Sequence, residues 1–303
     1  MENQRRTFGT VVVFLTYVVW GILCIYWGLL GGVNPVYILA NRIIWSAVFM
    51  GLYALLRHRG GEIRSVLTDK KAFGKCLLSG VLITINWGVY IYAVNSGHVL
   101  DASLGYFIQP VLVGLIGVLA FKERPTRLEW ATFVLAVLAL SYMLLRTGAL
   151  PYLSIIVAGS FAVYGGVKKN LKLSPEVALF TETLCMAPFA LGFIVYAEAN
   201  GMGAIGTATS AELVLLVLSG IVTSVPLLLF NIGVKHIPYY FSGILMYINP
   251  TIQFLIGLFY YKEALDTDRL VAFIVIWIGV LLALYDKLRR MKQETRGVGG
   301  VDI

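Results

Sequence analysis

Two charged residues lie deep inside apolar stretches of this 303-residue chain: Arg42 in the segment NRIIWS and Glu182 in the segment TETL. A charge surrounded by hydrocarbon is costly, so such a residue usually faces a water-filled cavity or a partner. Arg42 could hold an anionic group of a substrate, and Glu182 could carry a proton or bind a cationic group. The alternative is that each side chain only joins helices, in a buried ion pair or by reaching the membrane surface.

Two prolines, Pro110 and Pro250, each follow an amide residue in the middle of an apolar run. A proline inside a helix lacks one backbone donor and displaces the carbonyl four residues earlier. At membrane depth such a carbonyl persists only against protein or a water-lined cavity. We therefore expect helix kinks beside a polar patch near the midplane, formed by Tyr106, Gln109, Met246, Tyr247 and Asn249. The alternative is a packing kink whose carbonyls bond to neighbouring Ser or Thr side chains.

Further binding candidates are an amide and several aromatic residues. Asn86 and Tyr90 are four positions apart, so they share one face of a helix. They could contact a substrate, although an asparagine in this position also serves as an interhelical hydrogen-bond donor. Tyr17, Trp20 and Tyr164 are candidates for the aromatic walls of a cavity. Trp27 is expected to be an anchor at the membrane interface.

Motifs of other functional classes are missing from the sequence. It contains no HExxH, GxSxG or phosphate-cradling GxxxxGK[ST] pattern. The three cysteines, Cys24, Cys76 and Cys185, lack CxxC or Cys/His spacing, so we expect small buried side chains and no disulfide or metal site. The sequence therefore predicts no catalytic residue, no metal and no cofactor, and a gradient must drive any transport.

The composition is that of an integral membrane protein. Hydrophobic residues make up 59% of the chain and charged residues 13%, and the mean hydropathy is +0.83. A soluble domain carries about 25% charged residues. The apolar residues come in runs instead of alternating, which predicts helices and not a barrel. Ten runs are long enough to span a membrane: 8–30, 36–56, 73–95, 101–121, 128–147, 150–167, 175–197, 212–234, 240–261 and 268–288.

Basic residues predict how these spans are oriented. With both termini in the cytoplasm, 20 of the 24 Lys and Arg residues lie on the cytoplasmic side. One of the others, Arg42, lies within a span, and three lie outside: Arg146, Lys262 and Arg269. The net charge of +8 is therefore a topology signal and does not indicate nucleic-acid binding. The expected surroundings are a lipid bilayer, with residues 291–303 as a disordered cytoplasmic tail.

One unusual segment occurs twice. FIQPVLVGLIGVLAFKE (107–123) aligns without a gap to YINPTIQFLIGLFYYKE (247–263), 140 positions later. Five spans, 1–145, are thus followed by five more, 146–290. Because five is odd, the second set enters the membrane from the opposite side, which makes an inverted-topology repeat typical of secondary transporters. The alternative is chance similarity between two apolar segments.

This topology predicts how Arg42 and Glu182 are placed. The helix of Arg42 begins outside and the helix of Glu182 begins inside, and each charge lies roughly 10 Å deep at about 1.5 Å per residue. In a hydrocarbon core about 30 Å thick, one lies in the outer third and the other in the inner third. We expect no direct ion pair but two charged groups bordering one cavity. Burial disfavours a carboxylate, which suits Glu182 to proton coupling, and its neutralisation is expected to leave folding intact.

Motifs spread along the chain resemble those of a known family. They are NRIIWS (41–46), GVLITINWGVYIYAVN (80–95), ASLGYFIQP (102–110), SFAVYG (160–165), TETL (181–184), GIVTSVPLLLF (220–230) and YINP (247–250). Together they resemble the RarD branch of the EamA-type transporters, in the drug/metabolite transporter superfamily. The resemblance implies ten helices, cytoplasmic termini, and export-type secondary transport of a small molecule in a bacterial inner membrane. It does not supply a substrate, because relatives carry amino acids, nucleotide sugars and drugs.

The sequence leaves three functional classes open. The first is a secondary transporter that works by alternating access. The second is a channel or scaffold, and the third is an intramembrane enzyme, for which Arg42 and Glu182 alone cannot supply a nucleophile and its base. Helices 128–147 and 268–288 are expected at the periphery because they are almost purely apolar, with the other eight spans around a central cavity. The sequence is compatible with a monomer or a homodimer.

Overall fold

The computed structural model describes residues 2–95, 99–147, 152–262 and 267–298, and this part of the chain is helical throughout apart from its connections. The helices are α1 (Glu2–Gly28), α2 (Pro35–Leu56), α3 (Gly60–Thr68), α4 (Lys70–Asn95), α5 (Val99–Phe121), α6 (Arg127–Thr147), α7 (Tyr152–Asn170), α8 (Pro175–Ala199), α9 (Ser210–Gly233), α10 (Tyr239–Met246), α11 (Ile248–Phe259) and α12 (Thr267–Val298).

Helix ends are set by local sequence signals. The Asn34 side chain accepts hydrogen bonds from the first backbone N–H groups of α2, and Thr209 and Glu212 form a reciprocal capping box at the start of α9. Just beyond α5 and α11, Lys122 and Lys262 have φ of 53° and 54°. A residue with this left-handed backbone ends a helix and turns the chain away. The two lysines are 140 positions apart, so both copies of the repeated segment end in the same way.

Eight helical stretches in the described part of the chain are long and apolar enough to cross a membrane. The expected spans 101–121 and 150–167 are helical, as α5 and α7, but are not among the eight. Within the described side chains, α5 is an apolar helix over Ile108–Phe121, and α7 has 19 residues with two lysines in its last turn. The expected span 240–261 consists of two helices, α10 and α11, which meet at Tyr247.

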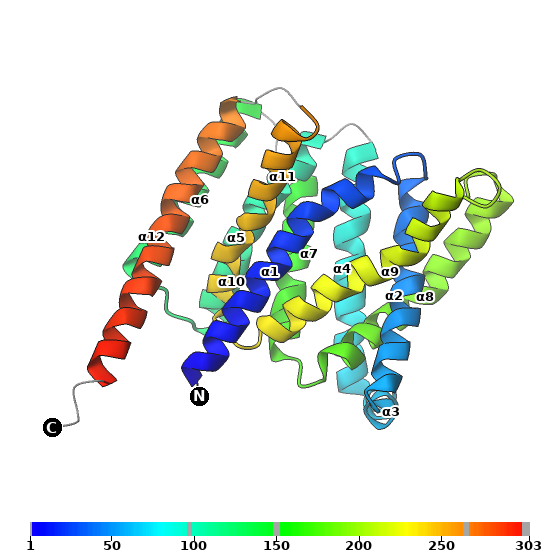
Figure 1. The fold of residues 1–303 in the computed structure, drawn as a ribbon, viewed down its shortest axis with the longest axis horizontal. Coiled ribbons are helices and arrows are strands. Elements are labelled where there is room, and N and C mark those ends of the chain that lie inside the picture. The colour runs from blue at the N-terminus through cyan, green and yellow to red at the C-terminus, as the bar shows by residue number, and fades with distance from the viewer. Residues whose placement is uncertain (1, 96–98, 148–151, 263–266, 299–303) are drawn as a thin grey trace.

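Helices from the two halves of the chain pack against each other (Figure 1). α2 lies on α8 and α6 lies on α12, while α5 contacts both α7 and α10. α1 contacts both α9 and α11, α2 also contacts α9, and α4 contacts α7 and α8. Exchanging α1 with α7, α2 with α8, α4 with α9, α5 with α10–α11 and α6 with α12 reproduces these neighbours. The packing therefore follows the 140-residue offset of the sequence.

Two glycines allow close crossings between these helices. A Cβ added at Gly80 would lie 2.8 Å from the carbonyl oxygen of Glu182, and one added at Gly220 would lie 2.4 Å from the carbonyl carbon of Trp45. Gly80 and Gly220 are also 140 positions apart. Small residues let helix backbones approach closely where side chains would separate them. α4 thus meets α8 in the same manner as α9 meets α2.

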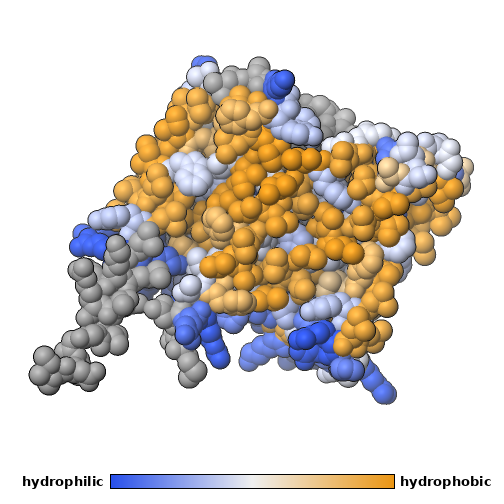
Figure 2. Space-filling view, in the orientation of Figure 1, coloured by the Kyte–Doolittle hydropathy of each residue, from blue (hydrophilic) through white to orange (hydrophobic). Residues whose placement is uncertain are grey.

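Apolar residues cover the middle of the visible face, and hydrophilic residues gather towards its two ends (Figure 2). The larger hydrophilic group lies at the end that holds α3 and the start of α1, and the end of α12 lies there too (Figure 1). An apolar belt between polar ends is the surface expected of a protein that crosses a bilayer. We call the end that holds α3 and the start of α1 the inner end, and the opposite end the outer end.

Candidate functional site

A cavity of about 420 Å³ lies between α1, α2, α4, α5, α7, α9, α10 and α11. Its lining comes from the last half of α1, the first third of α2 and the last half of α4, so the cavity extends from the middle of the bundle to the outer end. Leu30, Gly31 and Val33, from the link between α1 and α2, line it there. No described residue of α6 or α12 lines it, as expected for peripheral helices. α8 contributes no described lining residue either, in contrast to the expectation for its span.

Arg42 provides the positive charge of this cavity. Its guanidinium carbon lies 4.3 Å from the ring centre of Trp27 and 4.3 Å from that of Trp87. Its Nε donates a hydrogen bond of 2.9 Å to Oγ1 of Thr223, on α9. A guanidinium held by two indole rings and a hydroxyl keeps its charge without a carboxylate partner. No Asp or Glu is among the described residues that line the cavity.

Besides Arg42, the predicted residues that line this cavity are Tyr17, Trp20, Asn86, Tyr90, Tyr106, Gln109 and Asn249. Nδ2 of Asn86 donates a hydrogen bond of 2.6 Å to the carbonyl oxygen of Val157, so the interhelical role considered for this residue is also present. The rings of Tyr90 and Tyr106 stack edge to face at 5.7 Å. Amides and phenols thus line the same cavity as Arg42.

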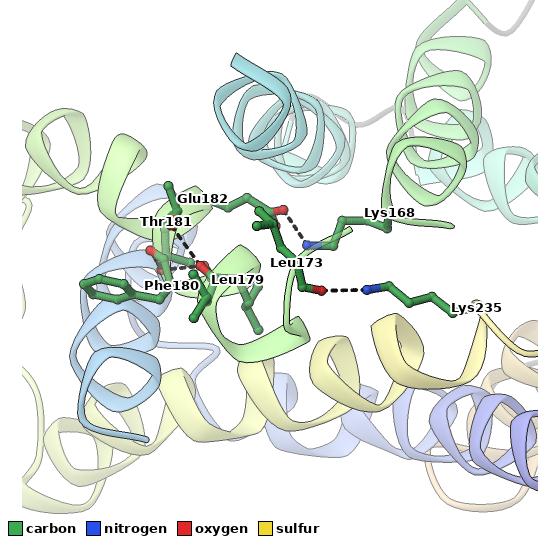
Figure 3. Close-up of polar contacts among 9 residues, drawn as sticks. Lys168, Leu173, Leu179, Phe180, Thr181, Glu182 and Lys235 are labelled. Atoms are coloured by element: carbon green, nitrogen blue, oxygen red, sulfur yellow. Dashed lines mark hydrogen bonds and ion pairs between the residues drawn. The ribbon is translucent and has the colours of Figure 1, made fainter. Parts of the chain in front are cut away.

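Glu182 lies elsewhere, in a buried ion pair (Figure 3). Its Oε1 lies 2.5 Å from Nζ of Lys168, and each side chain is 1% exposed. Lys168 comes from the end of α7 and Glu182 from the first half of α8. The expected absence of an Arg42–Glu182 pair agrees with this geometry, but Glu182 is not among the residues that line the cavity, so the two charges do not border one cavity. The physical reason is that the ammonium of Lys168, one turn from Tyr164, pairs with the Glu182 carboxylate. The buried charge is therefore balanced without a water-filled cavity.

Two further candidates are buried outside the cavity lining. Tyr164 lies close to the Lys168–Glu182 pair, and Tyr247 lies at the break between α10 and α11. Around the pair, the second carboxylate oxygen of Glu182, the Tyr164 hydroxyl and the Asn231 amide have no partner within hydrogen-bond distance in the described part of the chain. These groups form a second polar cluster, on the inner side of the cavity.

The two prolines differ in their effect on the helices. α5 continues through Pro110, whereas the equivalent segment is interrupted at Tyr247, three residues before Pro250. Both prolines are buried. A Cβ added at Gly243 would lie 2.7 Å from the carbonyl oxygen of Pro110, so α10 packs directly on α5 there. The two copies of the segment thus differ in helix continuity at their prolines, and Tyr106, Gln109, Met246 and Asn249 line the cavity beside them.

Several lining residues were not predicted as site residues. Trp27 was expected to be an interface anchor, yet its ring covers the Arg42 guanidinium. Trp87 and Thr223 hold the same guanidinium, and Gln253 donates a hydrogen bond of 2.9 Å to Oδ1 of Asn249. Trp87 adjoins Asn86 and Gln253 lies one turn after Asn249, so helical spacing could have identified these two. Nothing in the sequence alone pairs Thr223 with a residue 181 positions earlier.

The inner end of the cavity is closed by packed aromatic and polar residues. The Tyr17 hydroxyl and the Ser242 hydroxyl share a hydrogen bond of 2.9 Å. Further in, the Glu123 carboxylate accepts hydrogen bonds from the backbone N–H groups of Tyr239 and Tyr240, at 2.8 and 3.0 Å, and lies 3.1 Å from Lys169. Because Glu123 belongs to the first half and its partners to the second, these contacts hold the two halves together at the inner end.

The helical fold, with eight apolar helices in the part of the chain that the structure describes, is that of a multi-pass membrane protein with a central cavity. The chain belongs to the EamA-like transporter family, which matches residues 7–145 and 150–285, one stretch for each half. Within it, the chain falls in the RarD branch. It is 35% identical to Protein RarD of Streptomyces exfoliatus over 97% of this chain and 93% of that one. It is 29% identical to Protein RarD of Escherichia coli K12 over 98% of this chain and 100% of that one.

The chain is also similar to another bacterial protein and to a solved structure. The chain is 37% identical to the uncharacterized transporter YojE of Bacillus subtilis, over 95% of this chain and 97% of that one. One solved crystal structure, 18% identical in sequence, superposes with a TM-score of 0.72 over 92% of this chain and 97% of that chain. At this identity the superposition establishes the fold alone. No group of three or more His, Cys, Asp or Glu residues that could hold a metal occurs in the described part of the chain.

Proposed function

We propose that this protein is a secondary transporter of a bacterial inner membrane, with ten spans in two inverted five-span repeats and both termini in the cytoplasm. In this proposal α5 and α7 cross the membrane as well. The exchange of helix neighbours between the halves, the equivalent glycine crossings at Gly80 and Gly220, and the shared helix ends at Lys122 and Lys262 support it. Two similar halves of opposite orientation can rock about a central site and expose it to each side in turn.

The proposed substrate is a small organic anion with an aromatic or apolar body. The observation that carries this proposal is the Arg42 guanidinium, which is stacked between Trp27 and Trp87 in a cavity without a described carboxylate in its lining. Because Thr223 takes the Nε hydrogen, the terminal NH₂ groups are the part of Arg42 that would meet a carboxylate or phosphate. The aromatic walls would cover the rest of the molecule.

In this proposal the structure corresponds to an outward-open state. The cavity reaches the outer end through the link between α1 and α2, while the Tyr17–Ser242 hydrogen bond and the Glu123 contacts close the inner end. Opening to the cytoplasm would break these inner contacts and close the cavity at its outer end, beside the link between α1 and α2. Loading inside and release outside would amount to export, which corresponds to the expectation from the family resemblance.

Glu182 is the coupling residue of this proposal. It is buried beside Lys168 and Tyr164, on the inner side of the cavity. A proton that reaches the carboxylate would remove its attraction for Lys168 and loosen the contact between α7 and α8 at the inner end. The prediction is that the flux depends on pH and that this dependence disappears in Glu182→Gln.

The test begins with the substrate. Untargeted metabolite profiling of cells that lack or overproduce the protein should identify anions whose distribution changes, and counterflow of these anions is then measured in proteoliposomes. Arg42→Gln removes a charge-assisted hydrogen bond of roughly 1.5–3 kcal/mol, which corresponds to a rise of about 10- to 150-fold in the half-saturating concentration. Arg42→Lys keeps the charge but loses the planar stack, so we expect an intermediate effect.

A matched comparison isolates the role of the charge. For an anion and its neutral amide, Arg42→Gln should weaken the transport of the anion and leave that of the amide within about twofold, since only the anion uses the charge. Equal loss for both compounds would mean that Arg42 has a structural role. Flux that does not saturate with concentration would instead favour the channel hypothesis.

A further inference from the structure

A second cavity, of about 460 Å³, lies at the inner end of the molecule, away from the Arg42 cavity. Four separate parts of the chain form it: the start of α1, the link between α5 and α6, the end of α7, and the turn between α9 and α10. Its lining residues are Arg5, Arg6, Glu123, Arg124, Lys169, Lys235, His236, Ile237, Pro238 and Tyr240. We call this the basic pocket.

The basic pocket carries a large excess of positive charge. Five of its side chains are Lys or Arg and one, Glu123, is a carboxylate, which leaves four positive charges with His236 counted as neutral. Glu123 is already engaged by Lys169 and by the first two backbone N–H groups of α10. The carboxylate therefore stabilises the junction of the two halves and does little to neutralise the rest of the pocket.

Lys235 is one of the lysines that line the basic pocket. It is half-buried, and its Nζ donates a hydrogen bond of 2.8 Å to the carbonyl oxygen of Leu173, which is a neutral acceptor (Figure 3). Burial and the positive charge of Lys168 lower the pKa of the Lys235 ammonium below its ordinary value. An anion bound nearby would favour the charged form again. The pocket thus has a charged wall that an anionic ligand would stabilise.

The arginines of α1 are held over the pocket by tight packing. A Cβ added at Gly9 would lie 2.6 Å from Cβ of His236 and 3.0 Å from the carbonyl oxygen of Gly233, so α1 lies directly on the turn between α9 and α10. The Phe8 and His236 rings meet edge to face at 6.0 Å. One turn earlier in α1, Arg5 and Arg6 are exposed and line the same pocket. The position of this part of α1 over the pocket is therefore fixed by helix packing.

The general bias of basic residues towards the cytoplasm does not require such a pocket. Lys70 and Lys71, at the start of α4, are exposed on the same inner end and do not line the basic pocket. In the basic pocket, in contrast, four segments converge on one cavity and hold three arginines and two lysines around it. Arginine binds phosphate oxygens in a bidentate manner and lysine adds a compact charge, so the combination suits a phosphate group.

We propose that the basic pocket binds a phosphate-bearing anion at the inner surface of the membrane. The two sources of this chemistry are the headgroup of an anionic phospholipid and a soluble phosphate compound. Pockets of Lys and Arg between helices on the cytoplasmic side are suited to anionic headgroups. The proposal concerns a site separate from the transport cavity and does not depend on the nature of the transported substrate.

The test uses the purified full-length chain and its thermal unfolding midpoint, because a ligand that binds only the folded protein raises that midpoint. The first arm adds cardiolipin, phosphatidylglycerol or phosphatidylcholine to protein in neutral detergent. The second arm adds sodium phosphate against sodium chloride at equal ionic strength. Stabilisation by the anionic lipids alone assigns the headgroup, and stabilisation by free phosphate as well assigns the phosphate group itself.

A pair of matched variants locates the effect. Arg5→Gln/Arg6→Gln removes two charges from exposed positions in the basic pocket, and Lys70→Gln/Lys71→Gln removes two charges from the same end outside it. The first variant should need a roughly 30-fold higher concentration of the stabilising anion to reach half of the maximal rise in the unfolding midpoint. This factor follows from the usual free-energy contribution of a basic residue near an anionic surface, taken for two residues. The second should behave like the unmodified chain. Equal responses of both variants, or no stabilisation by any of these anions, would overturn the proposal.

Discussion

The buried Lys168–Glu182 pair gives the most direct test of the energetics inferred from the structure. Both side chains are 1% exposed, and Nζ and Oε1 are 2.5 Å apart. Removing one member of such a pair leaves an unpaired charge in the interior and destabilises a protein by about 3–5 kcal/mol. We therefore expect Lys168→Met and Glu182→Leu each to lower the stability by this amount. This prediction differs from the expectation, drawn from the sequence, that neutralising Glu182 leaves folding intact, and the unfolding measurement decides between them.

The double replacement separates a buried charge from a loss of packing. Lys168→Met/Glu182→Leu removes both charges and keeps the volume similar, and such exchanges are about neutral or stabilise by about 1–4 kcal/mol. We expect the double variant to recover most of the stability that either single variant loses. The pair is a local one, 14 positions apart across the turn from α7 to α8, so the recovery does not require the two halves to rearrange.

The measurement is the thermal unfolding midpoint of the purified protein in detergent. At roughly 2–4 °C per kcal/mol for a chain of this order of size, each single replacement lowers the midpoint by about 6–20 °C. The reasoning is refuted if both single variants unfold within about 2 °C of the unmodified chain. It is equally refuted if the double variant is no more stable than the weaker single one, since the two losses would then be independent.

Two further predictions concern packing and pH. Gly220→Ala places a Cβ 2.4 Å from the carbonyl carbon of Trp45 and should lower the unfolding midpoint sharply. The control Gly192→Ala places a Cβ with no atom within 4 Å and should keep or raise the midpoint. Similar shifts for both variants would contradict the close crossing of α9 and α2. The Asp268 carboxylate accepts a hydrogen bond from the Tyr142 hydroxyl and pairs with a nearby guanidinium, which holds its pKa below the ordinary 3.8. Its contribution is present above pH 3.8 and is lost as the pH falls further. The midpoint difference between the unmodified chain and Asp268→Asn should accordingly be constant near neutral pH and vanish in acid, and a difference that grows in acid would refute this.

The sequence alone was sufficient for the class of fold. Hydropathy predicted apolar helices long enough to cross a membrane, and the offset of 140 residues showed the repeated segment that relates the two halves. These features are readable because hydropathy and repetition are properties of contiguous segments. Gly80 and Gly220 were visible as a matched pair for the same reason, although their role at helix crossings required the coordinates.

The fate of the two buried charges depended on tertiary structure. Arg42 was recognisable as a residue that must face a cavity or a partner, and it lines the cavity. Glu182 faces a charged partner instead of the cavity, because it pairs with Lys168. The sequence contained both possibilities because the cost of burying a charge can be offset by solvent or by a counter-charge. Lys168 was assigned to the cytoplasmic surface on the basis of its position, and only the coordinates showed that its side chain is buried.

The helices and their apolar faces could be derived from the sequence because the interactions that form them act between residues a few positions apart. The site could be derived only in part. Asn86, Tyr90 and Gln109 were identifiable as polar groups on apolar helices, but the guanidinium of Arg42 is held by Trp27, Trp87 and Thr223, which come from three other helices. Which helices meet, and at what height, depends on packing between distant segments, and this packing is set by the whole fold.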